Sequence, residues 1–281
     1  MTNELITMTT QTNFSAFIRN LILPCRLDSA QLDLLTDSLG MRLYEKAFTH
    51  VSVNPKHNYE VYEQLGDITV NKFLVWYFHN RFSHNLNSPF GVKIIARLRI
   101  KYGSKQFLSE LSERLGFWDH IQIAEAVSHG KRMSLLEDVF ESFIGVTEYI
   151  IDQRIHPGLG YISCYRILES WFNPIPIDLS YEQLFDSKTR LKELFDLYRE
   201  QLGVLIYECD KLPNLHSVVK VFHKMGSERK YICSATSPIN KSLAEQLASE
   251  QALQVLAQQG FSKEVPAEYK SLMTTILTPN S

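Results

Sequence analysis

The chain has 281 residues, of which 44% are hydrophobic and 21% are charged, and it contains only 12 glycines and 10 prolines. These values are typical of a folded protein with room for about two ordinary domains, and they exclude disordered and fibrous classes. The formal net charge of −2 gives no overall sign of nucleic-acid binding, for which a basic excess is expected. Any hypothesis of RNA binding must therefore rest on local features.

The cysteine pattern, the N-terminus and the apolar runs argue against zinc-binding, disulfide-rich, secreted and membrane-spanning classes of protein. Cys25, Cys164, Cys209 and Cys233 are far apart and form no CxxC pair, so neither a zinc site nor a disulfide framework is indicated. The N-terminus lacks the basic and apolar regions of a secretory signal. No apolar run approaches the roughly 20 residues that span a bilayer. We therefore expect an intracellular, cytoplasmic protein without a membrane partner.

Helical periodicity dominates the first two-thirds of the chain. Residues 1–13 are polar, and from Phe14 onward Leu, Ile, Phe and Val recur at three- and four-residue intervals. The helices that this spacing predicts include residues 15–23, 30–40, 61–82, 103–117 and 134–153. Pro174 and Pro176 interrupt the pattern, because proline lacks an amide donor and disfavours helix in the residue before it. We expect a domain boundary there.

After Pro176 the pattern mixes helices with short alternating strands. The predicted order is a helix over 188–203, strands over 204–209, 217–224 and 230–236, and a helix over 242–260. The predicted fold class is therefore α+β with two domains, an all-α domain followed by an α-β-β-β-α unit.

Two groups of carboxylates recur at helical spacing. Glu60, Glu63 and Asp67 lie at i, i+3 and i+7 and share one helix face, and Asp138 and Glu141 lie at i and i+3 on another helix. Acidic residues on helices usually face solvent, and spacing alone favours that interpretation. Both helices are apolar over much of their surface, however, so we expect these acids to face an enclosed groove.

Clustered carboxylates raise one another's pKa and resist joint ionisation, a conflict that a bound divalent cation removes. Mg²⁺ takes oxygen ligands and is commonly bound by a few carboxylates together with substrate phosphate. Such a site can activate water and neutralise charge on a scissile phosphate. The acids are therefore a candidate centre for phosphodiester hydrolysis.

Three motifs make the chain resemble the ribonuclease III family over about residues 26–262. AFTHVS (47–52) resembles the AFTH-x-S element of the family. YEVYEQLGD (59–67) resembles the nine-residue signature NERLEFLGD, and LLEDVFESFIG (135–145) is similar to the second acidic helix of the family. The resemblance implies that the chain is an endoribonuclease.

The resemblance also assigns roles to the acids. It implies that Glu63, Asp67, Asp138 and Glu141 bind Mg²⁺, for which Mn²⁺ can substitute, and carry catalysis. Glu60 would have a supporting or RNA-contacting role. The family further implies a homodimer that cuts each strand of double-stranded RNA once and leaves staggered ends with 3′ overhangs.

Several positions depart from the family pattern. Tyr59 stands where the family has Asn, and Gln64 replaces an aromatic residue that helps to form the dimer contact. Val61 and Tyr62 also differ from the signature, and Glu137 occupies a usual Ala position beside Asp138. The change at Gln64 bears on the dimer geometry, whereas the four metal-binding acids keep the family pattern.

The unit after Pro176 resembles the double-stranded RNA-binding domain that often follows this nuclease. Such domains contact 2′-hydroxyls and phosphates of an A-form helix without reading its sequence. Matching positions would be Lys192 and Glu193 on the first helix, His216 in a loop, and Lys241 at the start of the last helix. From 186 to 261 there are 10 lysines and arginines against 9 acids, so the electrostatic contribution to binding is small.

The predicted division of the chain follows from both halves of the resemblance. It comprises an N-terminal extension (1–25), the endonuclease domain (26–174), a linker (175–185), the RNA-binding domain (186–262) and a C-terminal tail (263–281).

Two other functions remain open beside an active nuclease. One is a non-catalytic RNA-binding or ribosome-associated protein of the same fold, and the other is interference with RNA silencing by cutting or sequestering small duplexes, in a virus-infected cell for example. A protein without catalysis would be free to lose its acids, and all four stand at matching positions. The enzyme is therefore the favoured hypothesis.

Overall fold

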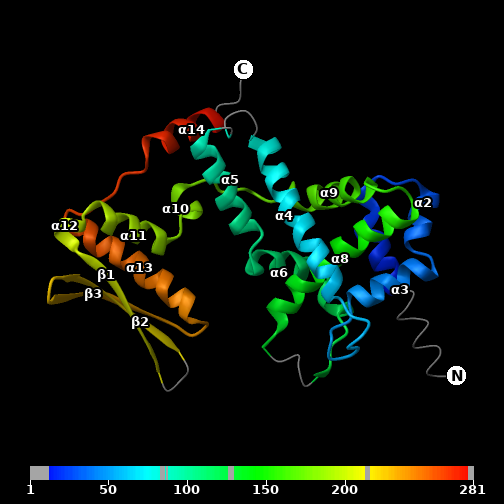
Figure 1. The fold of residues 1–281 in the computed structure, drawn as a ribbon, viewed down its shortest axis with the longest axis horizontal. Helices are drawn as coiled ribbons and strands as arrows, with labels where there is room; N and C mark the ends of the chain where they lie inside the picture. The colour runs from blue at the N-terminus through cyan, green and yellow to red at the C-terminus, as the bar shows by residue number, and fades with distance from the viewer. Residues whose placement is uncertain (1–12, 83–85, 87, 126–129, 213–215, 278–281) are drawn as a thin grey trace. The chain divides into compact units, whose positions relative to one another are not determined.

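The computed structural model describes residues 13–82, 86, 88–125, 130–212 and 216–277, and it divides into two compact units, Met1–Ile177 and Asp178–Ser281 (Figure 1). The division falls inside the predicted linker 175–185. Residues 1–12 of the predicted N-terminal extension and the last four residues of the predicted tail lie outside the described residues. The domain boundaries themselves stay predictions.

The regular secondary structure in the described part of the first unit is helical, apart from an isolated parallel bridge between Thr49 and Gln122. Its described helices are residues 13–22, η1 (Leu23–Cys25), α2 (Ser29–Leu35), α3 (Ser38–Ala47), α4 (Glu60–Phe82), α5 (Pro89–Tyr102), α6 (Lys105–Arg114), η3 (Phe117–His120), α8 (Arg132–Arg154) and α9 (Leu159–Phe172).

Helix α8 is the central element of this unit. It contacts α3, α4, α6 and α9, and both α4 and α8 are 23 residues long. Val139, Phe140, Phe143 and Ile144 are fully buried on α8, because hydrophobic residues cover most of its circumference. The remaining side of α8 carries the second group of acids.

The helix predicted over 30–40 is wrong as a single element. Thr36 ends α2, and Asp37 adopts an extended backbone and begins α3, with its carboxylate accepting hydrogen bonds from the amides of Leu39 at 3.0 Å and Gly40 at 2.8 Å. An aspartate satisfies the free amides of a helix start well, so it ends one helix and begins another despite the continuous apolar spacing.

The second unit contains one small sheet. Its elements are α10 (Tyr181–Leu184), α11 (Ser187–Leu197), α12 (Arg199–Leu202), β1 (Val204–Lys211), β2 (Ser217–Met225), β3 (Glu228–Ser237), α13 (Lys241–Gln258) and α14 (Ala267–Leu277). The strands are antiparallel in the order β1-β2-β3, with a register irregularity between Val221 and Phe222. A helical unit followed by a unit with a three-stranded sheet confirms the mixed fold class.

Helices α11 and α13 cover one face of this sheet (Figure 1). Val219 and Val221 of β2 pack in the same core as Leu191 of α11 and Ala248 of α13, and all four are fully buried. Alternate residues of a strand point to the same face, so this alternation places the core on the helix-covered side.

Helical turns also occur in the predicted linker and tail. Tyr269 of α14 lies 5.2 Å from Tyr181 of α10, ring centroid to ring centroid, and its side chain is 4% exposed. The two short segments therefore pack against each other within the second unit.

No helix in the described part of the chain is long and apolar enough to cross a membrane. All four cysteines are free thiols.

Candidate active site

The predicted catalytic acids come from the two long helices of the first unit. Glu63 and Asp67 lie on α4, and Asp138 and Glu141 lie on α8. Helix α4 begins at Glu60, whose amide donates to the Asn58 side chain at 3.1 Å, so its first acids stand directly at the helix start.

A close contact between the two backbones brings these acids together. A methyl group at Gly66 would overlap the carbonyl oxygen of Glu141, and one at Gly145 would overlap the carbonyl oxygen of Tyr62. Gly66 immediately precedes Asp67, so the absence of a side chain there permits the approach that places the acids of α4 beside those of α8.

The electrostatics of the cluster reflect this proximity. Glu141 is only 8% exposed, and burial, followed by the charges of Asp67, Glu137, Glu63 and Asp138, raises the pKa of its carboxyl group to about 8. Burial and neighbouring acids likewise raise the pKa of Glu63 to about 7. The cluster therefore carries more negative charge than its environment stabilises.

Tyr59 supports one member of the cluster. Its hydroxyl donates a hydrogen bond of 2.9 Å to Oδ2 of Asp138, and its side chain is 5% exposed. Burial raises the pKa of Asp138, while this hydrogen bond and the nearby Lys105 oppose the rise. The residue that departs from the family signature therefore orients a predicted metal ligand.

His50 of the AFTH element has a structural environment. It is 7% exposed, and its Nδ1 accepts a hydrogen bond from the amide of Ser52 at 3.0 Å. The His50 ring therefore takes part in a local hydrogen bond that is largely shielded from solvent.

Lys105, at the start of α6, is a residue that sequence reasoning missed. Its Nζ lies 2.5 Å from Oε2 of Glu137, and its charge also acts on Asp138, Glu141 and Glu63. Lys105 is separated from the acids of α8 by more than 30 residues, so no local pattern indicates this pairing. Glu137 is therefore neutralised by a partner on another helix.

The donor chemistry of the cluster fits a hard divalent cation, because all four predicted ligands are carboxylates whose mutual repulsion a cation relieves. Within the described residues, however, no three histidine, cysteine, aspartate or glutamate side chains converge closely enough to form a complete metal-binding group. The charges of these acids nevertheless act on one another, so the acids share a site. Glu60 is exposed at the edge of this site.

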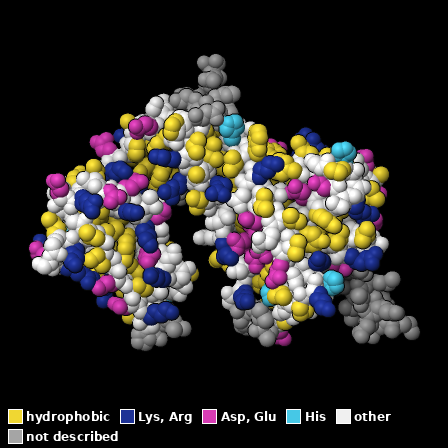
Figure 2. Space-filling model, viewed as in Figure 1, with side chains coloured by type: hydrophobic (Ala, Val, Ile, Leu, Met, Phe, Trp, Pro, Cys, Tyr) yellow, Lys and Arg dark blue, Asp and Glu magenta, His cyan; other side chains and the backbone are white. Residues whose placement is uncertain are grey.

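The predicted RNA-binding residues of the second unit have different surroundings. Lys192 is exposed on α11, and Lys241 begins α13, where it pairs with Glu245. Glu193 pairs with Lys263 at 2.7 Å, and the carbonyl of His216 accepts from the amide of Leu212. Figure 2 shows lysine and arginine side chains interspersed with acids over the visible face of this unit. Lys241 and Lys188 both pair with Glu245, and Lys188 was not among the predicted RNA-binding residues. Glu193 pairs instead with Lys263.

Comparisons with known proteins give close relatives. The chain is 36% identical over 275 residues, 93% of each chain, to the putative ribonuclease 3 of Invertebrate iridescent virus 6. It is 40% identical over 224 residues to the putative ribonuclease 3 of Frog virus 3 (isolate Goorha), covering 79% of this chain and 58% of the relative.

Comparisons with family models and with solved structures are less informative than the viral relatives. No family model matches the chain. Among solved structures, the nuclease domain of ribonuclease III from Campylobacter jejuni aligns with a TM-score of 0.41 and 22% identity, covering 54% of this chain and 99% of that domain.

Proposed function

We infer that this chain, which belongs to the ribonuclease III family, hydrolyses phosphodiester bonds of double-stranded RNA at the carboxylate cluster of α4 and α8. The family and the class of endoribonuclease predicted from the motifs are confirmed by the viral relatives. The observation that carries the proposed site is that burial, together with repulsion between the acids, raises the pKa of both Glu63 and Glu141 where α4 and α8 meet. A cationic cofactor and an anionic substrate would together explain such a cluster.

We propose Glu63, Asp67, Asp138 and Glu141 as the residues that hold Mg²⁺ or Mn²⁺. When bound, the metal supplies an activated water and neutralises charge on the scissile phosphate. The protein's part is to position the carboxylates: Tyr59 holds Asp138 by its hydrogen bond, and Gly66 and Gly145 fix the distance between the two helices. Lys105 keeps Glu137 paired and so limits the negative charge that faces an RNA backbone.

The test is cleavage of a labelled RNA duplex by the full chain with and without Mg²⁺. Asp67→Asn and Glu141→Gln should each lower the cleavage rate by several orders of magnitude while duplex binding persists. Glu200→Gln, which removes an exposed acid of α12, is the matched control and should cleave normally. Intact RNA with the wild-type protein under all metal conditions would refute hydrolysis and leave the non-catalytic RNA-binding function.

We further propose that the chain acts as a homodimer and leaves staggered ends with 3′ overhangs. Val61, Leu65 and Ile68 form a stripe along α4 at helical spacing and are 64%, 43% and 66% exposed. Exposed apolar side chains in a row are typical of an interface between chains. A second copy would cover them.

Analytical ultracentrifugation tests the dimer. Ile68→Glu should convert a dimer into a monomer at micromolar concentration, because a charge cannot be buried there without a partner. Leu197→Glu is the control, since Leu197 is similarly exposed at 58% but lies in the second unit. A wild-type monomer, or a dimer that survives Ile68→Glu, would contradict this interface.

The second unit is proposed to bind the duplex through Lys192, Glu193, His216 and Lys241. The viral origin of the relatives favours the cytoplasm of an infected cell as the setting, with RNA processing or interference with silencing as the role.

A further inference from the structure

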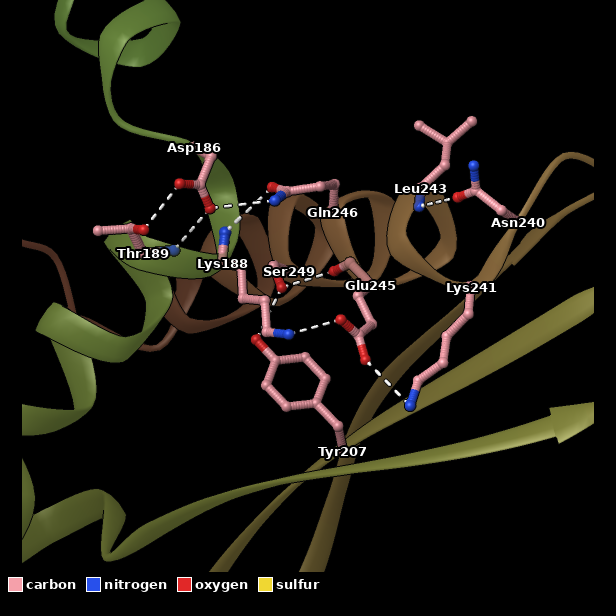
Figure 3. A network of polar contacts seen from close by, with 10 residues as sticks. All are labelled: Asp186, Lys188, Thr189, Tyr207, Asn240, Lys241, Leu243, Glu245, Gln246 and Ser249. Carbon is pink, nitrogen blue, oxygen red and sulfur yellow. Dashed lines mark hydrogen bonds and ion pairs between the residues drawn. The ribbon is translucent and has the colours of Figure 1, made fainter. Parts of the chain in front are cut away.

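Two lysines of the second unit converge on one carboxylate (Figure 3). Nζ of Lys188, at the start of α11, lies 2.5 Å from Oε2 of Glu245, and Nζ of Lys241, the first residue of α13, lies 3.6 Å from Oε1 of the same side chain. Each oxygen of Glu245 therefore has its own ammonium partner, supplied by a different helix.

The carboxylate is held in place beneath the two ammonium groups. The side chain of Glu245 is 15% exposed, while those of Lys188 and Lys241 are 45% and 63% exposed. Ser249 donates to the backbone carbonyl of Glu245 at 2.6 Å, and the hydroxyls of Ser249 and Tyr207 lie 2.7 Å apart. The ammonium group of Lys188 lies 5.4 Å from the centre of the Tyr207 ring. The lysines face solvent, and the acid lies behind them.

Stability alone does not account for this arrangement. Ion pairs of half-exposed lysines contribute little to folding, because water screens them and long side chains lose freedom. The two helices are already linked by hydrogen bonds of an uncharged side chain, since Gln246 donates to Asp186 at 3.0 Å and accepts from the amide of Lys188 at 3.3 Å. Two exposed cations gathered around one carboxylate present, instead, the pattern that receives a phosphate.

We propose that Lys188 and Lys241 form a binding site for a backbone phosphate of double-stranded RNA, and that Glu245 is an internal counter-ion that weakens this site. The inference rests on the proposed function, namely that the second unit binds duplex RNA. Glu245 reduces the combined charge of the three groups from +2 to +1, so a phosphate at the lysines is attracted less than by the lysine pair alone. The chain thereby limits its affinity for RNA backbones at this position.

Glu245→Gln is the informative change. Glutamine keeps the size of the side chain and an oxygen that can accept from Lys188, but it removes the charge. Duplex binding should tighten about fivefold at 0.1 M salt, the factor supplied by about one Coulomb contact at 4 Å in water. The slope of log Kd against log salt should steepen by about one, because one more net positive charge meets phosphate.

Binding is measured by fluorescence anisotropy with the full chain and a labelled RNA duplex of about 20 base pairs, slightly longer than the roughly 16 that such a domain spans. EDTA prevents cleavage, and salt is varied from 50 to 200 mM, a range over which phosphate contacts change affinity by orders of magnitude. Glu250→Gln is the matched control, because Glu250 is an exposed acid on the same helix and forms no ion pair with a lysine among the described residues. It should leave both affinity and slope nearly unchanged.

A double-mutant cycle separates this site from a general charge effect. Lys188→Ala and Lys241→Ala, each added to Glu245→Gln, should cancel most of the gain, and circular dichroism establishes that each variant is folded. A folded Glu245→Gln variant that binds no tighter than the wild type, or that gains affinity equally without Lys188 and Lys241, overturns the inference alone. Absence of duplex binding by every variant at 50 mM salt overturns RNA binding by this unit, and the inference with it.

Discussion

Glu141→Gln should stabilise the metal-free protein at neutral pH. Glu141 is 8% exposed, and its pKa is raised from 4.5 to about 8 by burial and then by the neighbouring acids. At pH 7 the folded protein therefore keeps this group protonated while the unfolded chain ionises it. At 1.36 kcal/mol per pH unit, this difference costs the folded state about 3 kcal/mol, an upper limit because the acids titrate together. Glutamine is uncharged in both states and removes the cost.

The sign of the pH dependence follows from the raised pKa. Below about pH 4.5 the ionisation of Glu141 costs the wild type no unfolding free energy. As the pH rises toward 8, the free energy of unfolding of the wild type should fall relative to that of the variant, which lacks this carboxyl group. Urea unfolding in EDTA between pH 4.5 and 8.5 measures it, with Glu200→Gln as the control for loss of an exposed acid. Added Mg²⁺ should stabilise the wild type more than the variant. Equal stability of the two proteins at every pH would refute the buried, mutually repelling cluster.

Three further predictions concern the surroundings of the site and of the fold. Gly145→Ala should destabilise the protein by about 1 to 3 kcal/mol in urea unfolding, because its methyl group would overlap the carbonyl of Tyr62; a neutral effect would contradict the close contact. Tyr59→Phe should weaken Mn²⁺ binding measured by calorimetry and shift the pH profile of cleavage, because Asp138 loses its hydrogen-bond donor; unchanged Mn²⁺ affinity would count against a positioning role. Asp37→Ala should cost about 0.5 to 2 kcal/mol at pH 7, since it removes the cap of α3. The Arg154 guanidinium holds the pKa of Asp37 well below its usual range, so this cost should shrink as the pH falls below about 4.

The placement of the acids on two helices could be predicted because helical spacing is a local property. The i, i+3 and i+7 spacing of Glu60, Glu63 and Asp67 puts them on one side of α4, and the motifs identified the partner helix. The glycine of each acidic motif, Gly66 before Asp67 and Gly145 after Glu141, was visible in the sequence. Its purpose, the contact between two backbones, became evident only from the structure.

Contacts between distant residues could not be predicted from the sequence. Lys105 and Glu137 are far apart in the chain, as are Lys188 and Glu245, and each pair meets only because helices from different places pack together. The prediction of a single helix over residues 30–40 was wrong for another reason. Asp37 was a visible helix-start signal, but the apolar spacing on both sides of it suggested one continuous helix.

The two units differ in what balances their charged clusters, so the overall charge of −2 says little about RNA binding. In the first unit, burial and the neighbouring acids raise the pKa values of Glu63 and Glu141, a conflict that a cation from outside the chain would relieve. In the second unit, the chain supplies the counter-ion itself, since Glu245 pairs with both Lys188 and Lys241. The acids of α4 and α8 would therefore be available to bind a metal ion, while Glu245 partly neutralises the two lysines. Catalysis and RNA affinity would then respond to different changes. Metal concentration would control catalysis by the first unit, and removal of the Glu245 charge would change the RNA affinity of the second unit.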